Sequence, residues 1–250
     1  MIDTHCHLES VDYDNIDVII SKCLECGVDK LIVSGHDVIS CEEALDLASK
    51  YENVYVTLGI LPDVIDKIDE EDLNKLDAML NNKKVVGVGE IGLDYHFVKD
   101  NKEKQKELFI KQLNLAKKHN LPVVIHCRDA IGDTYDILKN NHINRGTMHC
   151  YSGSLEYAHK FVDLGLYLSI GGVSTFKNAK EIKKVIKEIP LKHLLLETDS
   201  PYLTPEPYRV TKNYPYYIPI IAENIANIKN IDVDEVKNVT RANTNSVFDI

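Results

Sequence analysis

The sequence has few cysteines and no long apolar stretch, and each of these absences excludes a class of protein. Six cysteines among 250 residues are too sparse for a disulfide framework. No apolar run approaches the roughly 18 residues that a membrane-spanning helix needs. The first residues are polar and ionisable, so we expect no signal peptide. We therefore expect a soluble, cytoplasmic protein.

The sequence also lacks an excess of basic residues, its formal net charge being −10. This balance argues against a broad electropositive face that holds nucleic acid by neutralising its phosphates. It leaves a nucleic-acid substrate possible, because bound cations and a few local Arg and Lys residues can supply positive charge where it is needed.

Short β-branched runs alternate with longer amphipathic segments from one end of the chain to the other. The strands are expected over Ile2–His7, Lys30–Ser34, Val54–Leu58, Val85–Glu90, Pro122–His126, Gly146–His149, Leu166–Ser169 and Leu194–Thr198. The helices are expected near 14–26, 40–50, 69–81, 102–119, 130–141, 155–164, 178–188, 217–228 and 232–248. This pattern predicts an α/β protein, a (β/α)₈ barrel that forms a single domain over residues 1–250. A doubly wound open sheet is the alternative.

Ionisable residues lie at the carboxyl ends of several predicted strands, where the active sites of such barrels gather. Side chains alternate along a strand, so His5 and His7 point the same way and could bind one cation, although hydrogen-bonded structural histidines are the alternative. Charged groups at the mouth of an apolar barrel are costly unless they are paired or bind metal. Later strands end in four more such residues and strengthen the prediction of a metal centre: Glu90, His126, His149 and Asp199.

At these residues the chain resembles the TatD family of metal-dependent deoxyribonucleases, within the amidohydrolase superfamily. The resemblance covers essentially the whole chain. The matching segments are IDTHCHLE at the start, VGVGEIGLDYH at 86–96, LPVVIHCRDA at 121–130, MHCYSGS at 148–154, GGVSTFKNAK at 171–180 and LLLETDSPYLTP at 194–205. The resemblance implies a TIM-type barrel and magnesium-dependent hydrolysis of DNA phosphodiesters, typically as a 3′–5′ exonuclease. It also implies a two-metal site formed by His5, His7, Glu90, His126, His149 and Asp199.

Two segments depart from the family pattern. The family usually carries a His-Pro pair after its third strand, whereas this chain has Leu61 before Pro62. Near Arg209 the family commonly reads YRGKRNEP, and the segment 210–214 of this chain loses a basic and an acidic residue. Neither departure involves a predicted metal ligand, so both bear on substrate recognition.

Two carboxylates are the candidate catalytic residues. Glu90 suits a position between two cations because its two oxygens can bridge them. Asp199 can accept a proton from the attacking water. Glu197 faces the same way as Asp199 one layer deeper, so we expect it to orient a ligand.

Four residues are candidates for contact with the substrate. Arg128 could bind a phosphate oxygen with its donor fork, or it could form an ion pair with a nearby carboxylate. Tyr202 could stack on a base or a sugar, or it could pack against its neighbours. The resemblance places Arg209 and Lys177 in loops around the pocket, and a solvated surface position is the alternative for Lys177.

The predicted cofactors are two divalent metal ions, with Mg²⁺ expected and Zn²⁺ or Mn²⁺ as alternatives. The expected partner is DNA as a substrate, single-stranded or at its 3′ ends, with no membrane and with a monomer plausible. Two other functions stay open. One is an amidohydrolase-type hydrolase of a small amide or ester, or of D-aminoacyl-tRNA. The other is a catalytically silent, metal-bound scaffold.

Overall fold

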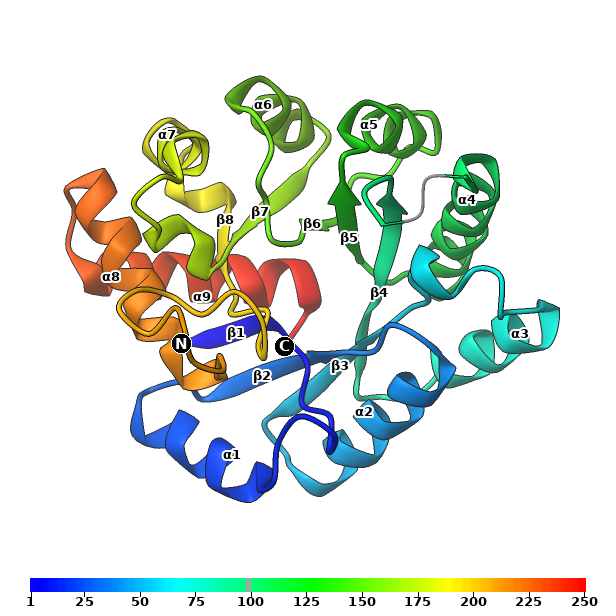
Figure 1. Cartoon of the computed structure of the whole chain (residues 1–250), viewed down its shortest axis with the longest axis horizontal. Helices are drawn as coiled ribbons and strands as arrows, with labels where there is room; N and C mark the ends of the chain where they lie inside the picture. The colour runs from blue at the N-terminus through cyan, green and yellow to red at the C-terminus, as the bar shows by residue number, and fades with distance from the viewer. Residues whose placement is uncertain (98–99) are drawn as a thin grey trace.

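Eight parallel strands pair in chain order and form the sheet at the centre of the protein. The computed structural model describes residues 1–97 and 100–250. Figure 1 shows the helices arranged around the outside of the strands. The strands are β1 (Ile2–Cys6), β2 (Lys30–Ser34), β3 (Val54–Leu58), β4 (Val85–Asp94), β5 (Val123–Arg128), β6 (Gly146–Met148), β7 (Leu166–Ile170) and β8 (Leu194–Leu196).

The first strand meets the segment that follows the last one, and this contact closes the barrel. The Asp199 N–H donates to the His5 carbonyl oxygen over 2.9 Å. The buried Asp3 carboxylate accepts from the Thr198 N–H at 2.9 Å and from the Thr198 hydroxyl at 2.5 Å. The (β/α)₈ barrel predicted from the sequence is therefore confirmed, and the open sheet is excluded.

A helix follows each of the first seven strands, and two more end the chain. They are α1 (Ile16–Glu25), α2 (Val38–Lys50), α3 (Glu70–Met79), α4 (Lys102–His119), α5 (Ile131–Asn140), α6 (Leu155–Asp163), α7 (Lys180–Glu188), α8 (Ile218–Lys229) and α9 (Val233–Phe248). Short 3₁₀ turns lie at Pro62–Val64, Gly172–Thr175, Leu191–His193 and Pro215–Tyr217. Within residues 1–97 and 100–250, no helix combines the length and the apolar character that crossing a bilayer requires.

The end of α9 fills the bottom of the barrel. Phe248 and Val247 are almost fully buried, and they belong to one apolar cluster with side chains from four strands, namely Ile32, Val86, Val124 and Leu195. In Figure 1 the C-terminus accordingly appears inside the ring of strands. Apolar packing therefore closes the amino-terminal end, and polar side chains gather at the other end.

Two buried glutamines of α4 hold the segments at the ends of β3 and β4. Gln105 and Gln112 are seven residues apart and so lie on one face of the helix. The Gln112 side chain accepts from the Ile60 N–H and donates to the Ile60 carbonyl, both at 2.8 Å. Gln105 does the same with the N–H and the carbonyl of Asp94, at 2.9 and 3.0 Å. A single helix thus fixes two segments at the mouth of the barrel.

The largest difference from the predicted elements concerns β4. This strand was expected to end at Glu90 but continues to Asp94, pairing with β5 over its last four residues. The register shifts between Val88 and Ile91. Glu90 therefore lies at an irregularity inside a long strand, where a bulge re-aims a side chain, and not at the strand's last position.

Candidate metal centre

The six residues predicted as ligands converge at the carboxyl end of the barrel. They come from β1, β4 and β5 and from the segments that follow β1, β6 and β8. His5, His7, Glu90 and His149 are buried, and His126 and Asp199 are partly exposed toward the mouth.

One group of ligand atoms has the spacing of a single coordination sphere. The Nε2 atoms of His5 and His7 face each other at 3.3 Å. Glu90 Oε2 lies 3.4 and 3.8 Å from these two nitrogens, and Asp199 Oδ1 lies 3.7 and 3.6 Å from them. Ligands about 2.0–2.1 Å from one tetrahedral ion lie about 3.4 Å from one another. The donor set and its spacing therefore fit a divalent cation.

A second group of ligand atoms gathers on the other oxygen of the same carboxylate. Glu90 Oε1 lies 2.8 Å from His126 Nδ1 and 3.2 Å from His149 Nε2. The two oxygens of Glu90 thus face different sets of imidazoles. This is the arrangement that a carboxylate needs in order to join two adjacent cation sites.

Neighbouring groups set the orientation of the imidazoles of His5 and His7. The His7 Nδ1–H donates to the Ser34 carbonyl oxygen at 3.0 Å, and His5 Nδ1 lies 3.1 Å from the Ser34 hydroxyl. Both contacts occupy the outer nitrogen of the ring and leave Nε2 directed at the centre. Partners of this kind fix the tautomer of a metal-binding histidine.

Glu197 supports His149 in the same way. Its carboxylate lies 3.2 Å from His149 Nδ1 and accepts from the Cys150 N–H at 2.7 Å. Because it faces the outer nitrogen of the ring and already accepts this bond, Glu197 is placed to orient His149. It can also be grouped geometrically with His5 and His149 as a ligand set, but its backbone bond favours the orienting position.

Asp94 holds His126, and the sequence analysis assigned this aspartate no role. Its Oδ2 lies 3.2 Å from His126 Nε2, so His126 is held between Asp94 on one side and Glu90 on the other. The other oxygen of Asp94 accepts from the N–H groups of His96 and Phe97 at 2.8 and 2.9 Å. One carboxylate thus orients a candidate ligand and also fixes the turn that follows β4.

The buried charges of the centre compensate one another. Burial on its own would raise the pKa of Glu90, but the charges of His149 and His5 and a hydrogen bond from His126 hold this pKa well below its usual range. Burial would lower the pKa of His126, but bonds to Asp94 and Glu90 outweigh it and raise that pKa to about 9 in the metal-free protein. Metal binding near neutral pH must therefore displace a proton from His126.

A cavity of about 450 Å³ opens above the ligand atoms. Its floor contains five of the six predicted ligands. The remaining lining residues are four apolar or aromatic residues, one histidine, one aspartate and one arginine. They are Leu61, Phe97, Tyr202, Leu203, His36, Asp63 and Arg128. The predicted substrate residues Arg128 and Tyr202 thus lie at the cavity.

The other two predicted substrate residues lie elsewhere. Arg209 and Lys177 are exposed, and neither is among the described residues that line the cavity. The Arg209 guanidinium lies over the Phe176 ring, 4.1 Å from its centre. If either residue contacts a substrate, it does so beyond the cavity.

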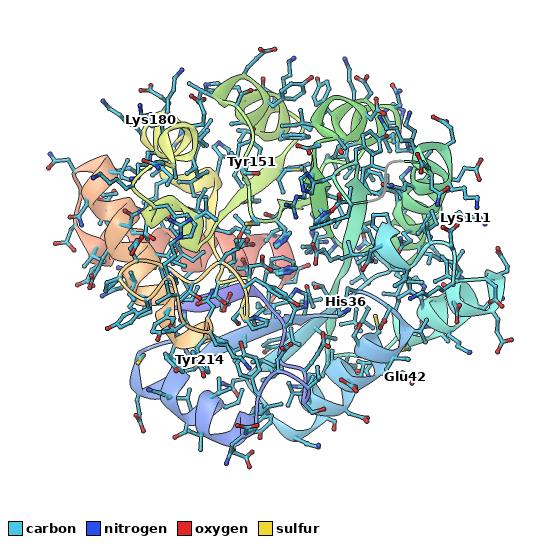
Figure 2. All side chains as sticks on the ribbon, in the orientation of Figure 1. His36, Glu42, Lys111, Tyr151, Lys180 and Tyr214 are labelled. Atoms are coloured by element: carbon cyan, nitrogen blue, oxygen red, sulfur yellow. The ribbon has the colours of Figure 1, made fainter. Side chains whose placement is uncertain are left out.

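His36 is a lining residue to which the sequence analysis could assign no role. Figure 2 labels it near the centre of the ring, whereas Lys111 and Lys180 lie on the outer helices. Its ring lies edge-on to that of His7, and its Nδ1 is 3.5 Å from a carboxylate oxygen of Glu9. Its position between β2 and α2 was the only sequence signal, since a loop between strand and helix opens at this end of the barrel.

The chain is similar along its length to proteins of one family. A family model described as "TatD related DNase" matches residues 2–249. The chain is 41% identical to YabD of Bacillus subtilis, named as an uncharacterized metal-dependent hydrolase, over 100% of this chain and 99% of that protein.

Two solved structures extend the similarity to the fold. YjjV of Escherichia coli, described as a TatD homolog, has 32% identity and a TM-score of 0.93, with 100% of this chain and 98% of that chain covered. A hydrolase TatD family protein from Entamoeba histolytica has 25% identity and a TM-score of 0.91, with 99% and 97% covered. The similarity therefore extends over the whole barrel.

Proposed function

Because this chain belongs to the TatD family of metal-dependent hydrolases, we propose that it hydrolyses phosphodiester bonds of DNA, acting as a 3′–5′ exonuclease on single-stranded ends. The observation that carries the proposal is the position of Glu90, whose two oxygens face two separate groups of ligand atoms. Two adjacent cation sites are the arrangement that many phosphodiester-cleaving enzymes use.

The ligands of the two proposed cations divide between the two oxygens of Glu90. His5, His7 and Asp199 would complete one site, and His126 and His149 the other. Mg²⁺ is the expected ion, and the four nitrogen ligands keep Zn²⁺ and Mn²⁺ as alternatives. When bound, such ions polarise a phosphoryl oxygen and lower the pKa of water.

Residues of the chain would accept the proton of the attacking water and bind the substrate. Asp199 is held ionised, because the pKa rise from burial is outweighed by a bond from His7 and by the charges of His149 and His5, which lower its pKa. A carboxylate that stays ionised at the cavity floor can take the proton of the attacking water. Arg128 at the cavity wall can hold a non-bridging phosphate oxygen, and Tyr202, 60% exposed, can stack on a base.

A small amide or ester, or D-aminoacyl-tRNA, is the second candidate substrate class. The observations that favour it are the net charge of −10 and the composition of the cavity wall, where Arg128 is the sole cation among the described lining residues. Leu61 and Leu203 add apolar surface there that a small organic group could contact. The bond that is cleaved therefore has to be decided by assay.

The test compares substrates on one preparation of protein stripped with EDTA and reloaded with Mg²⁺, Mn²⁺ or Zn²⁺. A single-stranded oligonucleotide, labelled at its 5′ end in one sample and its 3′ end in another, is offered beside a D-aminoacyl-tRNA and an amide panel. The proposal expects stepwise shortening of the 5′-labelled strand that stops with EDTA. Turnover of the amides or of D-aminoacyl-tRNA without any loss of DNA would replace it with the second candidate.

An Asp199→Asn variant tests the proposed base in the same assay. We expect it to fold as the wild type does, because the backbone N–H that donates to His5 is retained. Its turnover should fall by at least about 100-fold, the lower end of what a positioned general base contributes. Metal content is measured in parallel, so that a lost ion is not mistaken for a lost base.

A further inference from the structure

Phe97 is an aromatic side chain that lines the cavity with 70% of its surface exposed. Exposed aromatic surface on the wall of a cavity is available for contact with a ligand. Phe97 lies in the turn after β4, three residues beyond Asp94.

The backbone of Phe97 is held in place by bonds from the residues around the centre. Its N–H donates to Asp94 Oδ1 at 2.9 Å, and the Asp94 backbone is in turn bonded on both sides by the Gln105 amide. The second oxygen of Asp94 contacts His126. The backbone of Phe97 is therefore bonded to the same carboxylate that orients a candidate ligand, which places the residue at the cavity.

Arg128 lies against this ring. Its guanidinium carbon is 4.4 Å from the centre of the Phe97 ring. Arg128 is the last residue of β5 and lies two residues after His126. A guanidinium stacked on an aromatic ring keeps its N–H donors in a fixed plane. Because one face of Phe97 is covered by Arg128 while the side chain is still 70% exposed, the remaining surface of the ring is open to the cavity.

We propose that Phe97 and Arg128 form a subsite for one unpaired nucleobase beside the scissile phosphodiester, with Phe97 stacking on the base and Arg128 holding the adjacent phosphate. Base stacking on an aromatic ring is tolerant of sequence because every base has a flat π face. A base inside a duplex is already stacked on both sides and cannot use this surface. The subsite thus selects single-stranded ends of any sequence. This inference rests on the proposed nuclease function and names the part of the DNA that the cavity recognises.

The test removes either the ring or the base. Wild-type protein and a Phe97→Ala variant are assayed on single-stranded oligonucleotides that carry an ordinary 3′ end, or an abasic residue at the terminal or at the penultimate position. We expect the variant to lose roughly 10-fold or more in kcat/KM on the ordinary end, mainly through KM. On one of the two abasic ends the wild type should be slowed to a similar degree, and the substitution should then cause little further loss.

Phe176→Ala is the matched control. Its ring also lies under an arginine, Arg209, but Phe176 is not among the described residues that line the cavity. Because this variant keeps Phe97, we expect it to discriminate between ordinary and abasic ends as the wild type does, so that any loss relative to the wild type is equal on the two kinds of end. Phe97→Leu adds a second comparison, because it keeps apolar bulk and removes the π face.

Three outcomes would count against the subsite. Equal losses for Phe97→Ala on ordinary and abasic ends would mean that the ring only supports Arg128. No loss on either end would mean that the ring contacts no substrate. A wild-type protein that holds its metal yet degrades none of the oligonucleotides would overturn the nuclease function itself, and the subsite with it.

Discussion

Replacing Asp94 by asparagine should change the tautomer of His126 while it leaves the turn after β4 intact. The amide oxygen of the new side chain can still accept from the N–H groups of His96 and Phe97, which bond to Asp94 at 2.8 and 2.9 Å. The amide nitrogen would replace the oxygen that lies 3.2 Å from His126 Nε2. Two N–H donors cannot face each other, so the imidazole would move its proton from Nε2 to Nδ1.

That proton would occupy the nitrogen that faces Glu90 Oε1 at 2.8 Å and that we assign to the cation. Removing a partner that orients a metal-binding histidine typically weakens metal binding 10- to 100-fold, which is roughly 1.4–2.7 kcal/mol. We expect a loss of this size at the site formed by His126 and His149, and little change at the site formed by His5 and His7.

Calorimetric titration of the EDTA-treated protein with Mn²⁺ or Zn²⁺ measures this difference directly. The wild type should show two binding events, and the Asp94→Asn variant should show one strong and one weakened event. Glu197→Gln is the matched variant for His149, since Glu197 faces the outer nitrogen of that ring. If Asp94→Asn binds two ions with wild-type affinity, the tautomer argument is wrong.

Three further predictions concern stability. Phe248→Ala should lower the free energy of unfolding by about 3–5 kcal/mol in urea denaturation, because it leaves a cavity in a buried apolar cluster. The folded variant should keep its metal content. A loss of stability below about 1 kcal/mol would contradict this packing. Asp29→Asn should lower the free energy of unfolding by about 1 kcal/mol, because it removes a half-exposed bidentate pair with Arg241. Hydrogen bonds from Arg241 lower the pKa of Asp29, so the stability difference from the wild type should shrink as pH falls below about 4. A stability difference that stays constant down to pH 2 would refute this prediction. In the metal-free protein His126 has a pKa raised to about 9, so its contribution to stability is complete below its unfolded pKa of about 6.5 and disappears as pH rises toward 9. The affinity for metal should rise over the same pH interval. A metal affinity that falls over this interval would contradict the assignment of His126 as a ligand.

The positions of the strands in the sequence could be predicted because the local pattern of apolar residues determines them. Lys30–Ser34 and Val54–Leu58 match β2 and β3 residue for residue, since a short apolar run between two amphipathic helices has only one place to be buried. The carboxyl ends of these strands then place ionisable residues at one end of the barrel. For the same reason the convergence of the predicted ligands could be anticipated from strand position, although Glu90 lies inside β4 and not at its end.

The supporting contacts could not be predicted, because they depend on which residues meet across the barrel. In the sequence Ser34 is a serine at a strand end with no distinguishing feature. The structure shows its hydroxyl beside His5 and its carbonyl oxygen beside His7. Asp94 escaped notice because the expected strand stopped at Glu90, four residues before the end of β4.

Local chemistry also shifted one helix start. The helix expected near residue 40 begins at Val38, because Asp37 accepts from the Ser40 N–H and the Ser40 hydroxyl faces back toward Asp37. Both residues are favourable near a helix start, so the sequence alone does not decide between them. His36 lies in the loop before either start, at the cavity wall.

The central claim is that one carboxylate joins two cation sites on which hydrolysis depends. Elemental analysis of metal-reloaded, dialysed wild-type and Glu90→Gln protein, with nucleotide release measured on the same samples, tests it most directly. We predict two ions per wild-type chain, one or none in Glu90→Gln, and no nucleotide release by the variant. A wild type that retains no stoichiometric metal, or a Glu90→Gln variant with wild-type turnover, would contradict the claim.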